Sequence, residues 1–197
     1  RFVVCASCAE DRAHAAADYC SSLVQEQEYF TQRWSEVAIR GDALLYEGRM
    51  DEAKRLLDEG WPRFGASRLN LMTVVTAEAE FLRLRIDASL LDMNEAAIES
   101  AIAKTDLGRR ESTLSLAYRP VLRSIAARND GDVDRESVLL GEARQHFPQA
   151  GMEMHAAVMA RRRAQLGAGP NTDAWFINER MPRPERLQAW LLAERRG

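Results

Sequence analysis

Lysine is almost missing from this sequence of 197 residues, because Lys54 and Lys104 are the only two and arginine supplies every other basic side chain. We interpret this imbalance as the codon usage of a GC-rich genome, and arginine-rich surfaces also suit protein interfaces. Long apolar runs are missing too, which excludes a membrane-spanning helix of about 20 apolar residues. A net charge of −3 predicts no general attraction to nucleic acid or to an anionic membrane.

Cysteine is scarce, and three cysteines do not make a disulfide framework. Reduced thiols predict a cytoplasmic protein. Cys5, Cys8, His14 and Cys20 follow the order of a zinc knuckle, whose metal favours three thiolates and one imidazole. The segment is rich in alanine and is predicted to be helical, which points His14 away from Cys5, so the four ligands cannot converge. We therefore predict no metal and no other cofactor.

The motifs of common enzymes are also absent. The chain has no glycine-rich phosphate loop, no His-Arg-Asp or Asp-Phe-Gly triplet, and no His-Glu-x-x-His run. His146 and His155 flank a predicted turn and can approach each other, but neither has a cysteine or serine nearby in a triad-like arrangement. The sequence therefore predicts that this chain is not an enzyme.

Apolar residues recur at intervals of three and four, which is typical of amphipathic helices. The clearest stripe contains Met72, Val75, Ala79, Leu82, Ile86 and Leu90. The opposite stripe contains Thr73, Thr76, Glu80, Arg83 and Asp87, so we expect one buried and one solvated face. We predict helices at residues 8–24, 27–47, 51–60, 67–91, 94–108, 112–128, 133–147, 151–166, 172–180 and 184–196.

Capping and breaking residues set these limits. The predicted N-caps are Ser67, Asp51, Asn94 and Thr172. The predicted stops are Gly48, Gly108, Gly131 and Gly167. Pro120 is expected to kink its helix because it has no N–H to donate. Short connections predict antiparallel neighbours, and residues 1–197 are expected to form a single helical domain.

Two stretches share one spacing of small and bulky residues that is typical of tetratricopeptide repeats. The first set is Gly41, Gly48, Ala53, Leu57 and Gly60. The second set is Ser124, Gly131, Glu136, Leu140 and Ala143. Glu136 departs from the pattern, which expects a small alanine there, and the sets lie 83 residues apart, which is not a multiple of the 34-residue period. The predicted fold is an all-α, irregular tetratricopeptide-like stack of antiparallel helix pairs, an α-solenoid; the alternative is a generic antiparallel bundle.

The clearest repeat units are predicted at residues 33–62 and 116–148, with C-terminal capping helices over residues 151–197. Such a stack leaves a curved inner face made from the first helix of each pair. In the first unit that face should contain Ser35, Ala38, Asp42 and Tyr46, which we predict to form a groove for a protein or peptide partner.

The final third resembles a known family. Gly151 to Ala157 leads into Ala160 to Gly167, and Ala174-Trp175-Phe176 follows. Further matching positions are Glu179, Met181, Pro184, Arg186 and Leu187. This pattern is similar to the C-terminal end of the tetratricopeptide-like region that follows the kinase domain in certain large bacterial serine/threonine kinases. The stretch from Gly41 through Trp61 to Leu71 resembles that region as well.

The resemblance departs from the family pattern at Phe176, Glu179 and Met181, where Met, Gln and Ile are usual. It implies a helical regulatory or docking module and no catalysis by this chain. Because the sequence starts at Arg1 and not at methionine, we expect it to be part of a longer polypeptide.

Three function classes remain open from the sequence. The first is a protein-interaction or regulatory module attached to a bacterial serine/threonine kinase or a related signalling protein. The second is a helical domain that senses a small ligand, which an internal apolar pocket with a few converging polar groups would favour. The third is an enzyme with an unfamiliar site, which shifted carboxylates or histidines in a cleft would favour. Arg161, Arg162 and Arg163 spread over different helix faces, so we expect ion pairs there and no nucleic-acid binding.

Overall fold

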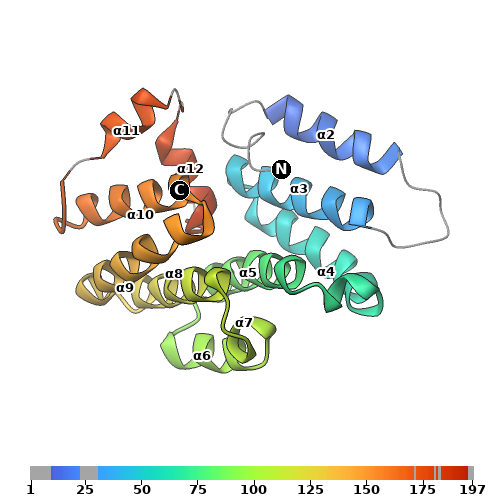
Figure 1. Ribbon diagram of the computed structural model, residues 1–197, viewed down its shortest axis with the longest axis horizontal. Coiled ribbons are helices and arrows are strands. Elements are labelled where there is room, and N and C mark those ends of the chain that lie inside the picture. Colours follow the sequence, from blue (N-terminus) through green and yellow to red (C-terminus); the bar gives the residue numbers. More distant parts are fainter. Residues whose placement is uncertain (1–9, 23–30, 171, 180, 182, 195–197) are drawn as a thin grey trace.

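The computed structural model describes residues 10–22, 31–170, 172–179, 181 and 183–194, and these ranges contain helices and turns without a strand (Figure 1). The helices are α2 (Glu10–Ser22), α3 (Thr31–Glu47), α4 (Met50–Ala66), η1 (Arg68–Leu71), α5 (Thr73–Leu90), α6 (Glu95–Ala103), α7 (Asp106–Arg109), α8 (Thr113–Asn129), α9 (Val133–His146), η2 (Pro148–Ala150), α10 (Glu153–Gln165), α11 (Asp173–Asn178) and α12 (Pro184–Leu191). The prediction of an all-α fold is confirmed. Within the described residues, no helix combines the length and the apolar character that a bilayer crossing requires.

Consecutive helices pack on one another along the chain. Figure 1 shows α5 and α8 as a base, with α2, α3 and α4 at one end and α9 to α12 at the other. The short helices α6 and α7 lie on the outer side of that base, against α8 and α5. The last helix, α12, returns to pack on both α10 and α3, so the C-terminal part of the chain reaches the opposite end. The inner side of the arrangement is therefore covered by the chain itself.

The two predicted sets of repeat residues occupy equivalent environments in α3–α4 and α8–α9. Gly41 and Ser124 are buried at helix crossings, and a Cβ atom on Gly41 would lie 3.5 Å from the Leu82 side chain. Leu57 and Leu140 are fully buried core residues, and the small Gly60 and Ala143 one turn later are buried as well.

The turns of these two helix pairs also have the same hydrogen bonds. The N–H of Arg49 donates to the Leu44 carbonyl, and the N–H of Asp132 donates to the Ala127 carbonyl, each at 2.8 Å. Gly48 and Gly131 have φ of 83° and 74°, the left-handed conformation that glycine adopts without strain. The predicted stops at these two glycines, and at Gly167 with φ of 78°, are confirmed.

The long central helix differs from its prediction. Helix α5 begins at Thr73, because residues 68–71 form the separate turn η1. Ser67 caps that turn instead, by accepting a hydrogen bond from the N–H of Leu69. The polar stripe of α5 is only partly solvated: Thr73, Arg83 and Asp87 are partly exposed, whereas Thr76 and Glu80 are buried together with most apolar residues of the helix. The reason is that α5 lies in the middle of the stack and has packed neighbours on several sides, which the sequence of one helix does not reveal.

Two other boundaries were predicted wrongly. Helix α4 continues past Gly60 and through Pro62, because Trp61 and Phe64 in its last turns pack on Trp34 of α3, with ring centroids 6.3 and 4.3 Å from that ring. Arg49, and not Asp51, is its N-cap residue.

The predicted helix at 94–108 breaks between α6 and α7. Asn94 caps α6 as predicted, with its side-chain oxygen 2.9 Å from the N–H of Ala97. The carboxylate of Glu80 accepts hydrogen bonds from the N–H groups of Asp106 and Leu107 at 3.0 and 2.9 Å and so caps α7 from another helix. Gly108 lies inside α7 and is not a stop.

Candidate functional site

The four residues predicted to line a partner groove all lie on α3, and the C-terminal helix contacts two of them, Asp42 and Tyr46. Ala38, Asp42 and Tyr46 are buried, and Ser35 is half-buried. The guanidinium of Arg186 in α12 lies 5.7 Å from the ring centre of Tyr46. The inner face therefore exists as a surface of α3, α5, α8 and α10 on which the chain's own α12 lies.

Asp42 is the central polar residue of this interface. Its Oδ1 atom accepts a hydrogen bond from Arg85 Nη2 at 2.6 Å and another from the indole N–H of Trp190 at 3.0 Å. Arg85 Nη1 also donates to the Trp190 carbonyl oxygen at 3.2 Å. The Asp42 and Arg85 side chains are only 7% and 3% exposed. The carboxylate and the guanidinium therefore compensate each other's loss of hydration. These contacts join α3, α5 and α12.

His155 on α10 is a buried neutral histidine in the same region. Its ring lies between Phe147, at 4.9 Å, and Trp190, at 5.7 Å. Burial, together with a smaller contribution from the positive charge of Arg85, lowers the pKa of His155 to about 3. The sequence suggested a pair of helix-end histidines at His146 and His155, whereas His155 faces the core from the first turn of α10.

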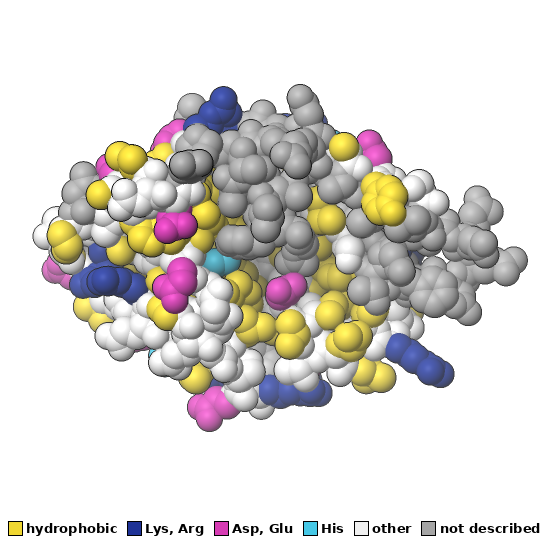
Figure 2. Space-filling view, turned by 45° about the horizontal axis from the view of Figure 1, so that its top comes forward, with side chains coloured by type: hydrophobic (Ala, Val, Ile, Leu, Met, Phe, Trp, Pro, Cys, Tyr) yellow, Lys and Arg dark blue, Asp and Glu magenta, His cyan; other side chains and the backbone are white. Residues whose placement is uncertain are grey.

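A cavity of about 300 Å³ lies at this junction of helices. The described residues that line it are Ser35, Asp42, Glu78, Phe81, Leu82, Arg85, Tyr118, Met152, His155 and Trp190. Phe81 and Tyr118 stack in parallel with their ring centres 4.0 Å apart. On the face turned forward in Figure 2, described hydrophobic side chains gather near the centre, and Lys and Arg side chains lie towards the edges.

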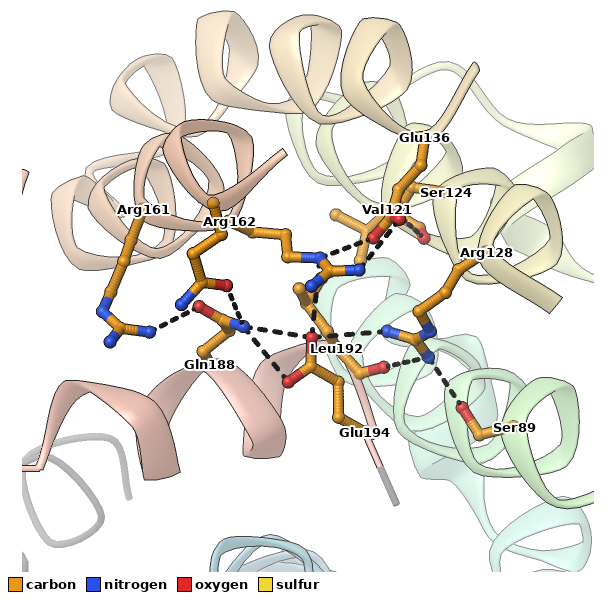
Figure 3. Close-up of polar contacts among 11 residues, drawn as sticks. Ser89, Val121, Ser124, Arg128, Glu136, Arg161, Arg162, Gln188, Leu192 and Glu194 are labelled. Carbon is orange, nitrogen blue, oxygen red and sulfur yellow. Dashed lines mark hydrogen bonds and ion pairs between the residues drawn. The ribbon is translucent and has the colours of Figure 1, made fainter. Parts of the chain in front are cut away.

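A second polar cluster fixes the end of α12 to α8, α9 and α10 (Figure 3). Arg128 Nη2 donates to the Leu192 carbonyl at 3.0 Å, and its other terminal nitrogen lies 3.7 Å from the Glu194 carboxylate. Burial lowers the pKa of the Arg128 guanidinium, and the charges of Glu194 and Glu136 oppose that effect. Gln188 of α12 donates to Glu194 at 3.1 Å and accepts from Arg161 at 2.7 Å.

The same cluster explains the residue that departed from the repeat pattern. Glu136 occupies the position of Ala53 in the first set, and its side chain is 2% exposed. Arg162 donates to both of its carboxylate oxygens, Nε to Oε1 at 2.9 Å and Nη2 to Oε2 at 3.0 Å. The sequence offered one signal for this pair, a glutamate at a position where the repeat pattern expects alanine, but it did not identify Arg162 as the partner.

The candidate metal ligands at the N-terminus are only partly within the described residues. Cys5, Cys8 and the Cys20 side chain lie outside them, and His14 Nε2 is 2.7 Å from a Glu47 carboxylate oxygen. In the part of the chain that is described, no three His, Cys, Asp or Glu side chains are grouped to hold a metal ion.

No family model, curated protein or solved structure matches this chain, so its relation to the kinase-associated helical region stays a prediction from the sequence.

Proposed function

We propose that this chain is a regulatory protein-interaction module with an irregular tetratricopeptide-like fold, which works by binding and not by catalysis. The equivalent burial and turn geometry of the two residue sets, 83 positions apart, support the repeat assignment. The sequence resemblance of the final third favours a place at the C-terminal end of a bacterial serine/threonine kinase or a related signalling protein in the cytoplasm.

One observation carries the proposal: a short helix with an aromatic anchor occupies the inner face. Leu187, Trp190 and Leu191 of α12 are buried there. Polar groups from α3, α5 and α8 meet its Trp190 ring, the Trp190 carbonyl and the Leu192 carbonyl. A surface that receives an apolar helix face and also binds its polar groups is the arrangement by which grooves capture helical segments of partners.

A partner helix would then bind by displacing α12. A tethered segment competes at an effective concentration in the millimolar range, so a free partner has to bind the face more tightly than α12 does, or α12 has to be released first. This competition gives the module a regulatory character.

The test uses a fluorescent peptide of residues 183–194 and the full chain. Fluorescence anisotropy should detect micromolar binding of the peptide to a Trp190→Ala chain, whose own α12 is weakened, and much weaker binding to the unchanged chain. A peptide with the same Trp190→Ala change is the matched control and should not bind. Leu187→Ala provides a second, milder chain variant.

If the peptide fails to bind both chain variants although circular dichroism shows that they keep their helical content, the inner face is not a helix-binding surface and the proposal is wrong.

The cavity of about 300 Å³ favours a second candidate, a helical domain that senses a small ligand. Its size is at the lower end of ligand pockets, and Asp42, Arg85 and His155 supply polar groups beside the apolar side chains of Phe81, Leu82 and Met152. A Ser35→Leu change narrows this cavity from the α3 side. It should abolish small-ligand stabilisation of the fold, if that is the function.

A further inference from the structure

A second pocket, far along the chain from the predicted groove, lies between α9, α10 and α11. Its volume is about 450 Å³, within the range of ligand sites. The described residues that line it are Gly141, Arg144, Gln145, Pro148, Glu153, Ala156, Ala157, Ala160, Arg163, Thr172 and Trp175. The alanines come from successive turns of α10 and form a smooth apolar wall, and the half-buried Trp175 ring borders it.

The three consecutive arginines of α10 differ in what they contact. Arg161 is bound to Asp173, and Arg162 is bound to Glu136. Arg163 lines the pocket and, among the described residues, has neither an ion pair nor a hydrogen bond, although its Nε atom is buried. Its guanidinium lies across Gly141 of α9, where a Cβ atom would be 3.4 Å from Arg163 Cζ. The absence of a side chain at Gly141 thus leaves the space that the Arg163 guanidinium occupies.

Two further polar groups of the pocket, one buried and one exposed, also have no partner among the described residues. The hydroxyl of Thr172 is buried without a hydrogen-bond partner in the described structure, and Arg144 on α9 has no ion pair there. Buried donors without acceptors cost free energy, and a ligand that supplies acceptors recovers it. Because Glu153 is the one carboxylate among the described lining residues, the two guanidiniums leave an excess of positive charge.

We propose that this pocket binds an organic anion, a carboxylate or a phosphate monoester attached to a flat apolar group. Arg163, Arg144 and the Thr172 hydroxyl would bind the anionic oxygens, since guanidinium groups form paired charge-assisted hydrogen bonds with both kinds of anion. The apolar group would lie against Trp175 and the alanine wall. This site is separate from the inner face and does not depend on α12 as a ligand.

Four probes separate the parts of the proposal: benzoate, phenyl phosphate, inorganic phosphate and benzamide, the neutral counterpart of benzoate. Titrations of the full chain, followed by the indole N–H signals in ¹H–¹⁵N NMR spectra, should show binding of benzoate and phenyl phosphate that shifts the Trp175 signal. Inorganic phosphate, which lacks the apolar group, and benzamide, which lacks the charge, should bind several-fold more weakly. The stronger of the two aromatic anions identifies the preferred anionic group. Raising NaCl from 50 to 500 mM should weaken binding.

Arg163→Gln should raise the dissociation constant of the better ligand about tenfold, the usual effect of losing a hydrogen bond between charged groups. Arg144→Gln should act in the same direction and, because Arg144 is exposed, does not disturb the fold. Arg55→Gln on α4 removes the same charge from an exposed site outside the pocket and should change nothing. Benzamide binding as tightly as benzoate, equal affinity of the Arg163→Gln and Arg55→Gln chains, or no Trp175 shift with any anion at tens of millimolar overturns the proposal.

Discussion

Glu136 offers a prediction on which the repeat pattern and the structure disagree. The pattern expects alanine at this position. If the pattern alone decided stability, a Glu136→Ala change would restore the typical residue and would stabilise the fold or leave its stability unchanged. In the structure, the Glu136 side chain is 2% exposed and binds Arg162 through both carboxylate oxygens. Its removal leaves the Arg162 guanidinium without its main partner.

The expected loss follows from the surroundings of Arg162. Breaking a fully buried ion pair on one side costs about 3–5 kcal/mol. The Arg162 side chain is 21% exposed and keeps the Glu194 carboxylate at 3.8 Å, so some compensation remains. We therefore expect Glu136→Ala to lower the free energy of unfolding by about 2–3 kcal/mol, below the value for a fully buried pair. In a chain of this size that loss corresponds to a Tm lower by roughly 4–12 °C.

Urea denaturation followed by circular dichroism measures this loss of stability. Two further variants serve as a control and as a test of the ion pair. Glu142→Ala changes an exposed glutamate on the same helix and should stay within about 0.5 kcal/mol of the unchanged protein. The double change Glu136→Ala with Arg162→Met removes both charges and should recover at least about 1 kcal/mol, since an apolar replacement of a whole buried pair is often neutral. The reasoning is refuted if Glu136→Ala is no less stable than Glu142→Ala, or if the double variant is no more stable than Glu136→Ala alone.

Two other predictions concern pH and glycine. Because the pKa of His155 is about 3 in the folded chain and about 6.5 when unfolded, the unfolded state binds an extra proton between these values. Stability should therefore fall as pH drops below 6.5, by about 1.4 kcal/mol per pH unit from this group, and His155→Phe should remove that part of the slope in urea titrations at pH 4.5 to 7.5. A Gly108→Ala change places a Cβ atom 2.2 Å from the Ile102 carbonyl oxygen and should lower Tm by several degrees. By contrast, a Cβ atom at Gly65 on α4 meets nothing within 4 Å, so Gly65→Ala should raise the free energy of unfolding by about 0.5–1 kcal/mol. Calorimetry that ranks the two glycine variants equally would contradict this.

Local sequence signals were sufficient where the residues that start or end a helix lie within or next to that helix. The glycines after α3, α8 and α10 mark those ends, because a left-handed residue is needed there and glycine adopts that conformation most easily. Asn94 was identified as the cap of α6 for a similar reason, since its acceptor lies three residues from the N–H that it binds. In each case the interacting groups are neighbours in sequence.

Local signals failed where a distant residue decided the outcome. The break between α6 and α7 depends on Glu80, 26 residues away from the first N–H that it caps. Burial raises the pKa of Glu80, while these backbone hydrogen bonds oppose that rise, a balance that no feature of residues 94–108 reveals. The extension of α4 through Pro62 likewise depends on the contact of Trp61 and Phe64 with Trp34.

The residues of the candidate groove were predicted to share one face of a helix, and they do, but the sequence did not predict that another helix of the chain packs on that face. The spacing of Ser35, Ala38, Asp42 and Tyr46 places them on one stripe of α3 by helix geometry alone. That α12 returns across the stack to pack on α3, and that Asp42 meets Arg85 and Trp190 there, depends on contacts 43 and 148 residues apart.

By itself, the sequence determined that this chain is helical, where most helices start and stop, and that two helix pairs share one pattern, because these properties arise from side chains within a few residues of one another. Only the tertiary structure decided which helices are buried on more than one face. It also decided that the glutamate at an alanine position has an arginine partner and that the last helix packs on the inner face. These outcomes depend on the free energy of burying charges and apolar surface between segments far apart in the chain, which no local spacing encodes.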